Sequence, residues 1–167
     1  FKTGVPMDGF WVATVGGLVY YDKNMGTYQD IVHPDIFGRY ISKVYQNDHG
    51  DLWLYIPQSN GVIQFKTTNF YLMYGFYDPS KDFVPIKSLT DQKYSLLSDN
   101  INDIFFDSNG TSWFATNKGI SKLKSSNDVF KIKYFVDNAH SISIARDNTL
   151  WFSHNKGVTA INNKGEQ

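Results

Sequence analysis

The sequence predicts an all-β fold made of β-propeller blades, each a four-stranded antiparallel meander. Two observations predict it. Each of the four tryptophans follows a polar turn and precedes, by a few residues, a glycine with an aliphatic neighbour. The tryptophans lie 42, 60 and 38 residues apart, at Trp11, Trp53, Trp113 and Trp151. Two of these spacings are close to the period of about 40 to 45 residues that four-stranded blades show, and the middle one carries about 20 more.

The segment from residue 96 to residue 124 shows the repeated unit most clearly. Apolar residues predict a first strand at 101–106, and Asp107–Gly110 predicts a hairpin turn, because Asn and Gly tolerate the positive φ angles of tight turns. A second strand follows around Trp113, and the turn Asn117–Gly119 leads into a third. The unit is therefore an antiparallel meander.

Four such units divide the chain, which we interpret as one partial propeller domain over residues 1–167. Their expected bounds are about 1–38, 39–96, 97–138 and 139–167. Further strands are expected at 11–14, 18–22, 28–32, 40–46, 52–54, 62–65, 71–76, 130–136, 141–145 and 158–161. A sheet of this kind cannot bury both faces alone, so we expect all four tryptophans to be core residues between neighbouring blades.

The number of strands indicates about 3.5 blades, whereas closed propellers have about four to eight. We interpret the chain as part of a propeller of about seven blades. A complete small propeller of about four blades, in which the two chain ends share one blade, is the alternative.

Composition narrows the possible functions. Sixteen Lys and Arg residues balance sixteen Asp and Glu residues, so the chain has no electrostatic footprint for nucleic acid or an anionic membrane. It has no cysteine, which excludes disulfides and thiolate metal sites. No run approaches the roughly 18 apolar residues of a membrane span, so we expect no membrane contact from this segment.

The residue types that carry catalysis and metal binding form no recognisable motif. The histidines are not spaced as metal ligands, and no nucleophile elbow, phosphate loop or dinucleotide fingerprint is present. We therefore expect no metal, no cofactor and no catalytic residue in this segment. The histidines are His33, His49, His140 and His154.

The period breaks between residues 69 and 95, where seven aromatic residues gather. Residues 71–76 are expected to form the outer strand of the second blade, and residues 77–95 an enlarged loop. Insertions in repeat proteins map to loops, often on a binding face.

The tyrosines of this segment are the candidate ligand-binding residues. Aromatic rings can stack on the apolar faces of sugars while polar neighbours bind the hydroxyls. We therefore name Tyr71, Tyr74 and Tyr77 as candidates. The alternative is that these rings pack against a neighbouring blade.

Each unit follows one order: strand, Asp-x-x-Gly, Trp-x-x-Thr and Gly-aliphatic. The best matches are Ser98–Ile101, Asp107–Gly110, Trp113–Thr116 and Gly119–Ile120, and the first unit keeps Asp8–Gly9, Trp11–Thr14 and Gly17–Leu18. In this order the chain resembles the two-component regulator propeller repeat, with four matched units over essentially its whole length. It departs from that pattern at Tyr55 and His154, which replace the Thr, and at Asp147–Thr149, which lacks the turn glycine.

The resemblance implies a function. Propellers of this family form the extracytoplasmic sensor half of bacterial hybrid two-component histidine kinases and often sense products of carbohydrate breakdown. It implies a periplasmic ligand-sensing module of an inner-membrane receptor, with the kinase activity elsewhere. Its expected partners are a small-molecule or oligosaccharide ligand, the other propeller blades and a second copy of the receptor in a homodimer.

Two other functions stay open. One is a propeller lyase or hydrolase, because streptogramin-lyase-like propellers have similar units, although the Thr after Trp and the Gly-aliphatic step favour the regulator repeat. The other is a protein-interaction scaffold that recruits partners through open blade edges.

Overall fold

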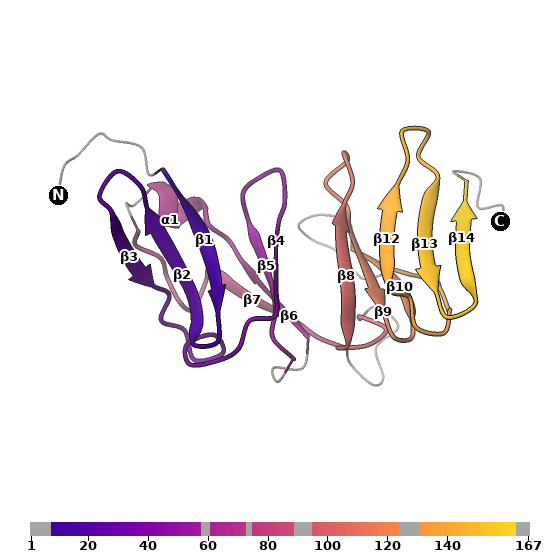
Figure 1. The fold of residues 1–167 in the computed structure, drawn as a ribbon, viewed down its shortest axis with the longest axis horizontal. Helices are drawn as coiled ribbons and strands as arrows, with labels where there is room; N and C mark the ends of the chain where they lie inside the picture. Colours follow the sequence, from indigo (N-terminus) through magenta and orange to yellow (C-terminus); the bar gives the residue numbers. More distant parts are fainter. Residues whose placement is uncertain (1–7, 58–60, 73–74, 89–94, 124–130, 163–167) are drawn as a thin grey trace. The chain divides into compact units, whose positions relative to one another are not determined.

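The computed structural model describes residues 8–57, 61–72, 75–88, 95–123 and 131–162 (Figure 1). The chain forms two compact units, residues 1–85 and 86–167. Consecutive antiparallel meanders make up both units, which confirms the predicted all-β class of propeller-like blades. Among the described residues, no helix has the length and apolar character needed to cross a bilayer.

The first sheet, called sheet A here, has three strands in the order β1-β2-β3. They are β1 (Gly9–Thr14), β2 (Gly17–Asp22) and β3 (Thr27–Asp30). A two-residue turn joins β1 to β2, and Thr14 closes it on both sides. Its Oγ1 accepts a hydrogen bond from the backbone N of Gly16 (3.1 Å) and donates one to the carbonyl O of Gly17 (2.9 Å).

The same turn recurs in the third repeat, which explains the Thr and Gly of the sequence pattern. Thr116 Oγ1 accepts from the backbone N of Lys118 and donates to the carbonyl O of Gly119. Gly119 has φ +132°, and a Cβ placed there would meet the carbonyl O of Tyr134. Glycine adopts such a conformation without steric cost, because it has no Cβ. His154, which replaces the Thr, still accepts the equivalent bond, from the backbone N of Lys156 to Nδ1 (3.3 Å).

Sheet B contains four strands in the order β4-β5-β6-β7. They are β4 (Lys43–Gln46), β5 (Leu52–Tyr55), β6 (Val62–Phe65) and β7 (Phe83–Ile86). The outer strand predicted at residues 71–76 is wrong. The chain after β6 instead forms the short helix α1 (Thr68–Leu72), and β7, from within the predicted loop, is the outer strand. Pro85 is tolerated in β7 because an edge strand does not need every donor.

Sheet C repeats the arrangement with strands in the order β11-β10-β9-β8. They are β8 (Ile101–Phe106), β9 (Ser112–Thr116), β10 (Gly119–Leu123) and β11 (Lys131–Tyr134). The Asp107–Gly110 turn predicted from the sequence joins β8 to β9. Asp107 Oδ1 accepts bonds from the backbone N of Asn109 and of Thr111, and Oδ2 accepts one from Trp113 Nε1 (3.0 Å). The aspartate therefore ties the turn to the repeated tryptophan.

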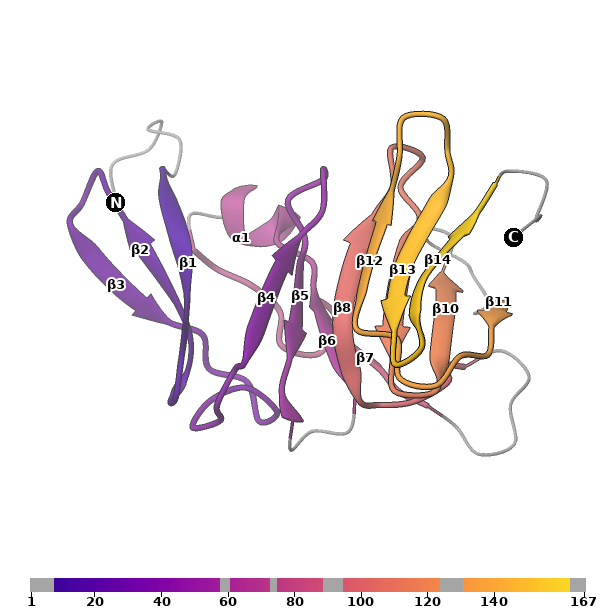
Figure 2. The same cartoon turned by 45° about the vertical axis from the view of Figure 1, so that its right-hand side comes forward.

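Sheet D has three strands in the described part of the chain, in the order β12-β13-β14. They are β12 (Ser141–Ile144), β13 (Leu150–His154) and β14 (Gly157–Ile161). Figure 2 shows these strands at the C-terminal end of the second unit.

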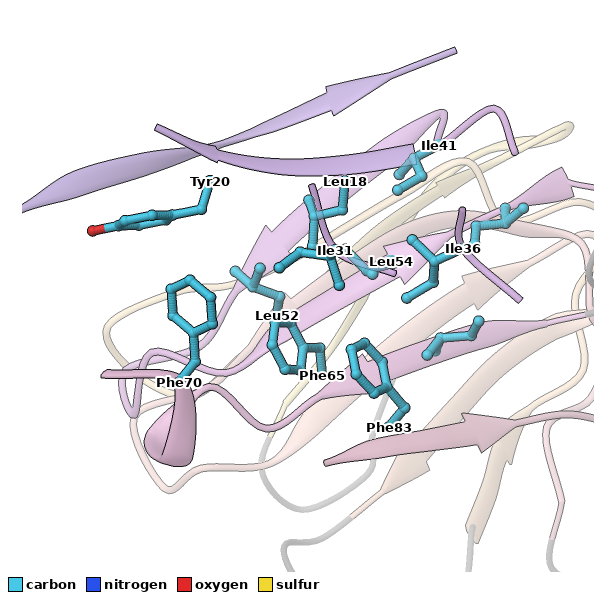
Figure 3. Close-up of a cluster of buried hydrophobic side chains, with 12 residues drawn as sticks. Leu18, Tyr20, Ile31, Ile36, Ile41, Leu52, Leu54, Phe65, Phe70 and Phe83 are labelled. Carbon is cyan, nitrogen blue, oxygen red and sulfur yellow. The ribbon is translucent and has the colours of Figure 1, made fainter. Parts of the chain in front are cut away.

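Each unit is held together by a hydrophobic core between its two sheets. In the first unit, Leu18 and Tyr20 of sheet A meet Leu52, Leu54 and Phe65 of sheet B (Figure 3). In the second, the core consists of Trp113, Ala115, Ile120, Ala139, Ile142, Leu150, Phe152 and Ile161. Burial of such side chains stabilises each by about 1.5–3 kcal/mol, so these inter-sheet cores dominate the stability.

The expectation that all four tryptophans are core residues holds for three of them. Trp53 and Trp113 are buried, and Trp11 is half-buried against the first core. Trp151 is 47% exposed, because among the described residues no sheet covers its face of β13.

Candidate functional site

The insertion between β6 and β7 is the part of the first unit that departs most from the repeat, and it folds back onto sheet A. Hydrogen bonds attach it to sheet A and to the chain just after β3. They join Trp11 to Tyr71, Gln29 to Gly75, and the backbone of Val32 to Tyr77. The segment therefore covers the first core instead of extending as a free loop.

Tyr71 lies in α1 and is half-buried. Its hydroxyl oxygen accepts a hydrogen bond from Trp11 Nε1 at 2.9 Å. Its ring makes edge contacts with Trp11, Tyr20 and Phe70, with ring centroids between 5.7 and 6.4 Å apart. The helix thus places Tyr71 on the face of sheet A that carries the first tryptophan.

Tyr77 is also half-buried and uses its hydroxyl on the backbone of residue 32. The backbone N of Val32 donates to Tyr77 Oη (2.7 Å), and Oη lies 3.3 Å from the carbonyl O of the same residue. Its ring contacts Phe65, Phe70 and Phe83. Burial raises the pKa of Tyr77, and the bond to Val32 offsets part of that rise.

Two of the three candidate tyrosines therefore share one aromatic cluster, and both hydroxyls have structural partners. This geometry favours the alternative in which the rings pack between blades. Tyr74 lies outside the described residues, so the ligand-binding assignment of the three tyrosines stays a prediction.

Sequence reasoning did not single out Tyr20, which lies at the centre of the cluster. Its side chain is 1% exposed, and its hydroxyl has no hydrogen-bond partner among the described residues. Burial raises its pKa to about 12, with smaller contributions from Tyr71, Asp22 and Asp8. Tyr20 lies two residues after Leu18 in the strand predicted at 18–22 and therefore on the same face, but nothing in the sequence showed that its hydroxyl would be buried.

The described histidines have ordinary neighbours. His33 stacks on Phe83, with centroids 4.4 Å apart, and His154 Nε2 lies 2.9 Å from Thr159 Oγ1. His140 Nε2 lies 3.0 Å from Asn155 Oδ1. Among the described residues, no group of three or more His, Cys, Asp or Glu side chains is arranged to hold a metal ion.

Comparison with known proteins identifies the fold. No protein-family model matches the sequence, and no curated protein matches it. Solved structures do match, and all of those described below share less than 25% sequence identity with the chain, so the likeness shows the fold alone.

Three of these structures are informative. PorZ, a surface component of the type-IX secretion system of Porphyromonas gingivalis, has a TM-score of 0.66 and 16% identity, over 95% of this chain and 25% of PorZ. The extracellular domain of the hybrid two-component system BT3049 from B. thetaiotaomicron has a TM-score of 0.63 and 18% identity, over 93% of this chain and 19% of that domain. Virginiamycin B lyase from Staphylococcus aureus, with quinupristin, has a TM-score of 0.59 and 16% identity, over 99% of this chain and 55% of the lyase.

The present chain therefore spans a quarter or less of PorZ and of the BT3049 domain, and about half of the lyase. Extracellular domains of two-component systems are among the proteins that share its fold, as the resemblance of the repeat predicted.

Proposed function

We propose that this chain is part of the extracytoplasmic sensor region of a hybrid two-component receptor, located in the periplasm, and that its ligand is a small molecule or an oligosaccharide. The observation that carries the proposal is the likeness to the BT3049 extracellular domain over 93% of the chain. The repeat motif supports it independently, because it was found from the residues alone. Kinase chemistry belongs to other parts of such a receptor.

The mechanism would be a population shift. A ligand that binds one arrangement of the receptor better than another favours that arrangement by its difference in affinity. The aromatic insertion is the proposed ligand contact, with Tyr71, Tyr74 and Tyr77 as the residues tested first.

A thermal-shift screen against oligosaccharides tests the proposal. A ligand at about 100 times its dissociation constant stabilises the folded state by about 2.7 kcal/mol, which raises the midpoint by several degrees. We expect at least one glycan to do so, and the Tyr77→Ala variant to respond less. A flat response to every glycan would remove the carbohydrate proposal.

An enzyme is the second candidate, because the lyase shares the fold over 99% of this chain. Incubation with quinupristin followed by mass spectrometry distinguishes the two. The sensor proposal expects unchanged quinupristin, and turnover would replace that proposal with the lyase.

A scaffold is the third candidate, and the likeness to a secretion-system surface component favours it. Affinity capture with the purified chain would then retain a defined protein from the secretion apparatus, whereas the sensor proposal expects none.

A further inference from the structure

A network of polar side chains lies at one end of the second unit, where the β11–β12 connection meets the β13–β14 turn (Figure 2). Asn155 Nδ2 donates to Asp137 Oδ2 (3.0 Å), and Asn155 Oδ1 lies 3.0 Å from His140 Nε2. Asn138 Nδ2 donates a longer bond to Asn155 Oδ1 (3.5 Å). Asn102 of β8 donates in turn to Asn138 Oδ1 (2.9 Å). We call these five side chains, which come from three segments of the chain, the asparagine network.

The first unit builds the corresponding connection without such a network. In the second unit the backbone N of Ala139 donates to the threonine carbonyl of the tryptophan hairpin, and in the first unit Ile41 does the same. The residue with positive φ in each connection also donates to that hairpin turn, and it is Asn138 (+55°) or Gly38 (+74°). Among the described contacts, residues 37–41 make this junction with backbone bonds alone. The fold therefore does not require the asparagine network.

The exposure of the network also argues against a purely structural role. Asp137, His140 and Asn155 are all exposed. Hydrogen bonds between exposed side chains add little to stability, because water competes for the same groups. Polar side chains that a rigid scaffold holds in place on its loops are typical of binding sites.

The free groups of the network define the chemistry of its ligand. Among the described contacts, Asp137 Oδ1 and His140 Nδ1 have no partner. Each asparagine amide carries both donors and an acceptor, as does each hydroxyl of a sugar, so closely spaced groups of this kind match neighbouring sugar hydroxyls. Phe135 of the same connection is 76% exposed and adds apolar surface.

A buried acceptor beside the network lacks a donor. Asn117 Oδ1, in the β9–β10 turn, is buried and has no hydrogen-bond partner among the described residues. The backbone N of Asn138 donates to the carbonyl O of Asn117 (3.0 Å), so the two residues are in direct contact. An unpaired buried acceptor is unfavourable, and a ligand hydroxyl supplies the kind of donor that it lacks.

We propose that the asparagine network is a binding site for a saccharide, which it holds through neighbouring hydroxyl groups. All of its residues belong to the junction between sheets C and D. The inference rests on the proposed ligand-sensing function, because it gives the same class of ligand a contact separate from the aromatic insertion.

A matched pair of variants tests the proposal in a thermal-shift assay with cellohexaose, xylohexaose, maltohexaose and mannohexaose. Asn138→Gly removes the central side chain, and the positive φ of Asn138 suits glycine, so the fold should be kept. Asn148→Gly is the control, because Asn148 also has a positive φ (+64°) but lies in the β12–β13 turn, at the opposite end of sheet D. At least one hexasaccharide should stabilise the wild-type chain. Asn138→Gly should raise its dissociation constant about tenfold or more, and Asn148→Gly should leave it unchanged.

NMR of the side-chain amides locates the contact directly. In the nitrogen-labelled chain, the amide signals of Asn138 and Asn155 should move as that hexasaccharide is added, and the signal of Asn148 should stay in place. A network that only supported the fold would not respond in this way.

Two results would overturn this inference and leave the sensor proposal standing. One is a hexasaccharide that still stabilises Asn138→Gly but no longer stabilises Tyr77→Ala, because it binds the aromatic insertion alone. The other is a midpoint of ligand-free Asn138→Gly more than about 5 °C below that of Asn148→Gly, because the network would then be needed for folding. If no hexasaccharide changes the midpoint or the amide signals, this inference and the carbohydrate proposal both fail.

Discussion

Asp107 is the residue that links the most conspicuous turn of the sequence to the repeated tryptophan. Burial raises the pKa of its carboxyl, but the bonds from Trp113, Thr111 and Asn109 outweigh that effect, and the pKa lies below its usual value. A carboxylate that accepts several hydrogen bonds is stabilised in its charged form. The motif Asp-x-x-Gly-x-x-Trp is therefore a hydrogen-bonded unit, a role that the sequence pattern did not reveal.

Asp107→Asn should destabilise the chain by about 1–3 kcal/mol near neutral pH. The amide NH₂ of the asparagine would face the indole N–H of Trp113, which donates a hydrogen bond to a carboxylate oxygen of Asp107 in the wild-type chain. The folded-state pKa is lowered, so this stabilisation is complete above the unfolded pKa of about 3.8 and is lost as the pH falls through the folded value. Urea unfolding at neutral and acidic pH measures it.

The control for that experiment is Asp147→Asn in the corresponding turn of sheet D. Asp147 accepts a bond from the backbone N of Thr149, and no bond to Trp151 accompanies it among the described contacts. Its substitution should cost less than Asp107→Asn. Equal losses at both positions would contradict the role given to the indole bond.

The Trp11–Tyr71 hydrogen bond should appear as a coupling in a double-mutant cycle. Tyr71→Phe and Trp11→Phe each remove one partner, and we expect a coupling energy of about 0.5–1.5 kcal/mol in chemical denaturation. Tyr77→Phe is the matched control, because Tyr77 bonds to the backbone of Val32. If Trp11→Phe coupled equally to Tyr77→Phe, the effect would be general loosening of the cluster.

At the level of single elements, the Trp-x-x-Thr, turn, Gly-aliphatic segment depends on a glycine in a conformation that other residues rarely adopt. Gly119 and Gly157 have nearly the same φ, +132° and +131°. They differ in surroundings, because a Cβ on Gly119 meets the backbone of residues 134–136, whereas a Cβ on Gly157 meets nothing within 4 Å. Comparing an alanine substitution at Gly119 with one at Gly157 therefore separates the cost of backbone strain from the cost of a packing clash.

Both Gly→Ala substitutions should cost about 1–3 kcal/mol from the backbone conformation alone. Gly119→Ala should cost more, because the backbone around Tyr134 at β11 has to move. Thermal unfolding of the two variants measures the difference. Equal midpoints would mean that the β10–β11 contact is looser than the structure shows.

The strands that follow a turn motif were predictable because the turn residues mark where each strand begins, as at Asp107–Gly110. Helix α1 and strand β7 were not predictable. Residues 69–77 are dense in aromatics without a clear period of two, and short apolar runs of this kind do not distinguish helix from strand. Tertiary bonds decide the outcome: Asp82, 4% exposed, accepts bonds from the side chain of Asn69 and the backbone of Asp78.

For the whole chain, the repeat predicted the class of fold but not which tryptophan would be exposed. Trp11 and Trp113 pack against apolar cores, whereas Trp151 has serine and alanine beside it in the strand register and is 47% exposed. Whether a residue of the repeat is buried depends on the sheet that packs against it. The sequence of a single repeat unit therefore cannot predict that burial. The candidate tyrosines stood out in the sequence because their segment interrupts the repeat, and Tyr71 and Tyr77 pack against the first core.

Fluorine NMR of the chain labelled with fluorotryptophan tests the central claim, that within each unit the tryptophan-bearing face of the first sheet packs onto the second sheet. Four resonances are expected, assigned by single Trp→Phe replacements. The account predicts that the Trp113 resonance is insensitive to a soluble paramagnetic agent, while the Trp151 resonance broadens strongly. Equal broadening of Trp113 and Trp151 would contradict it.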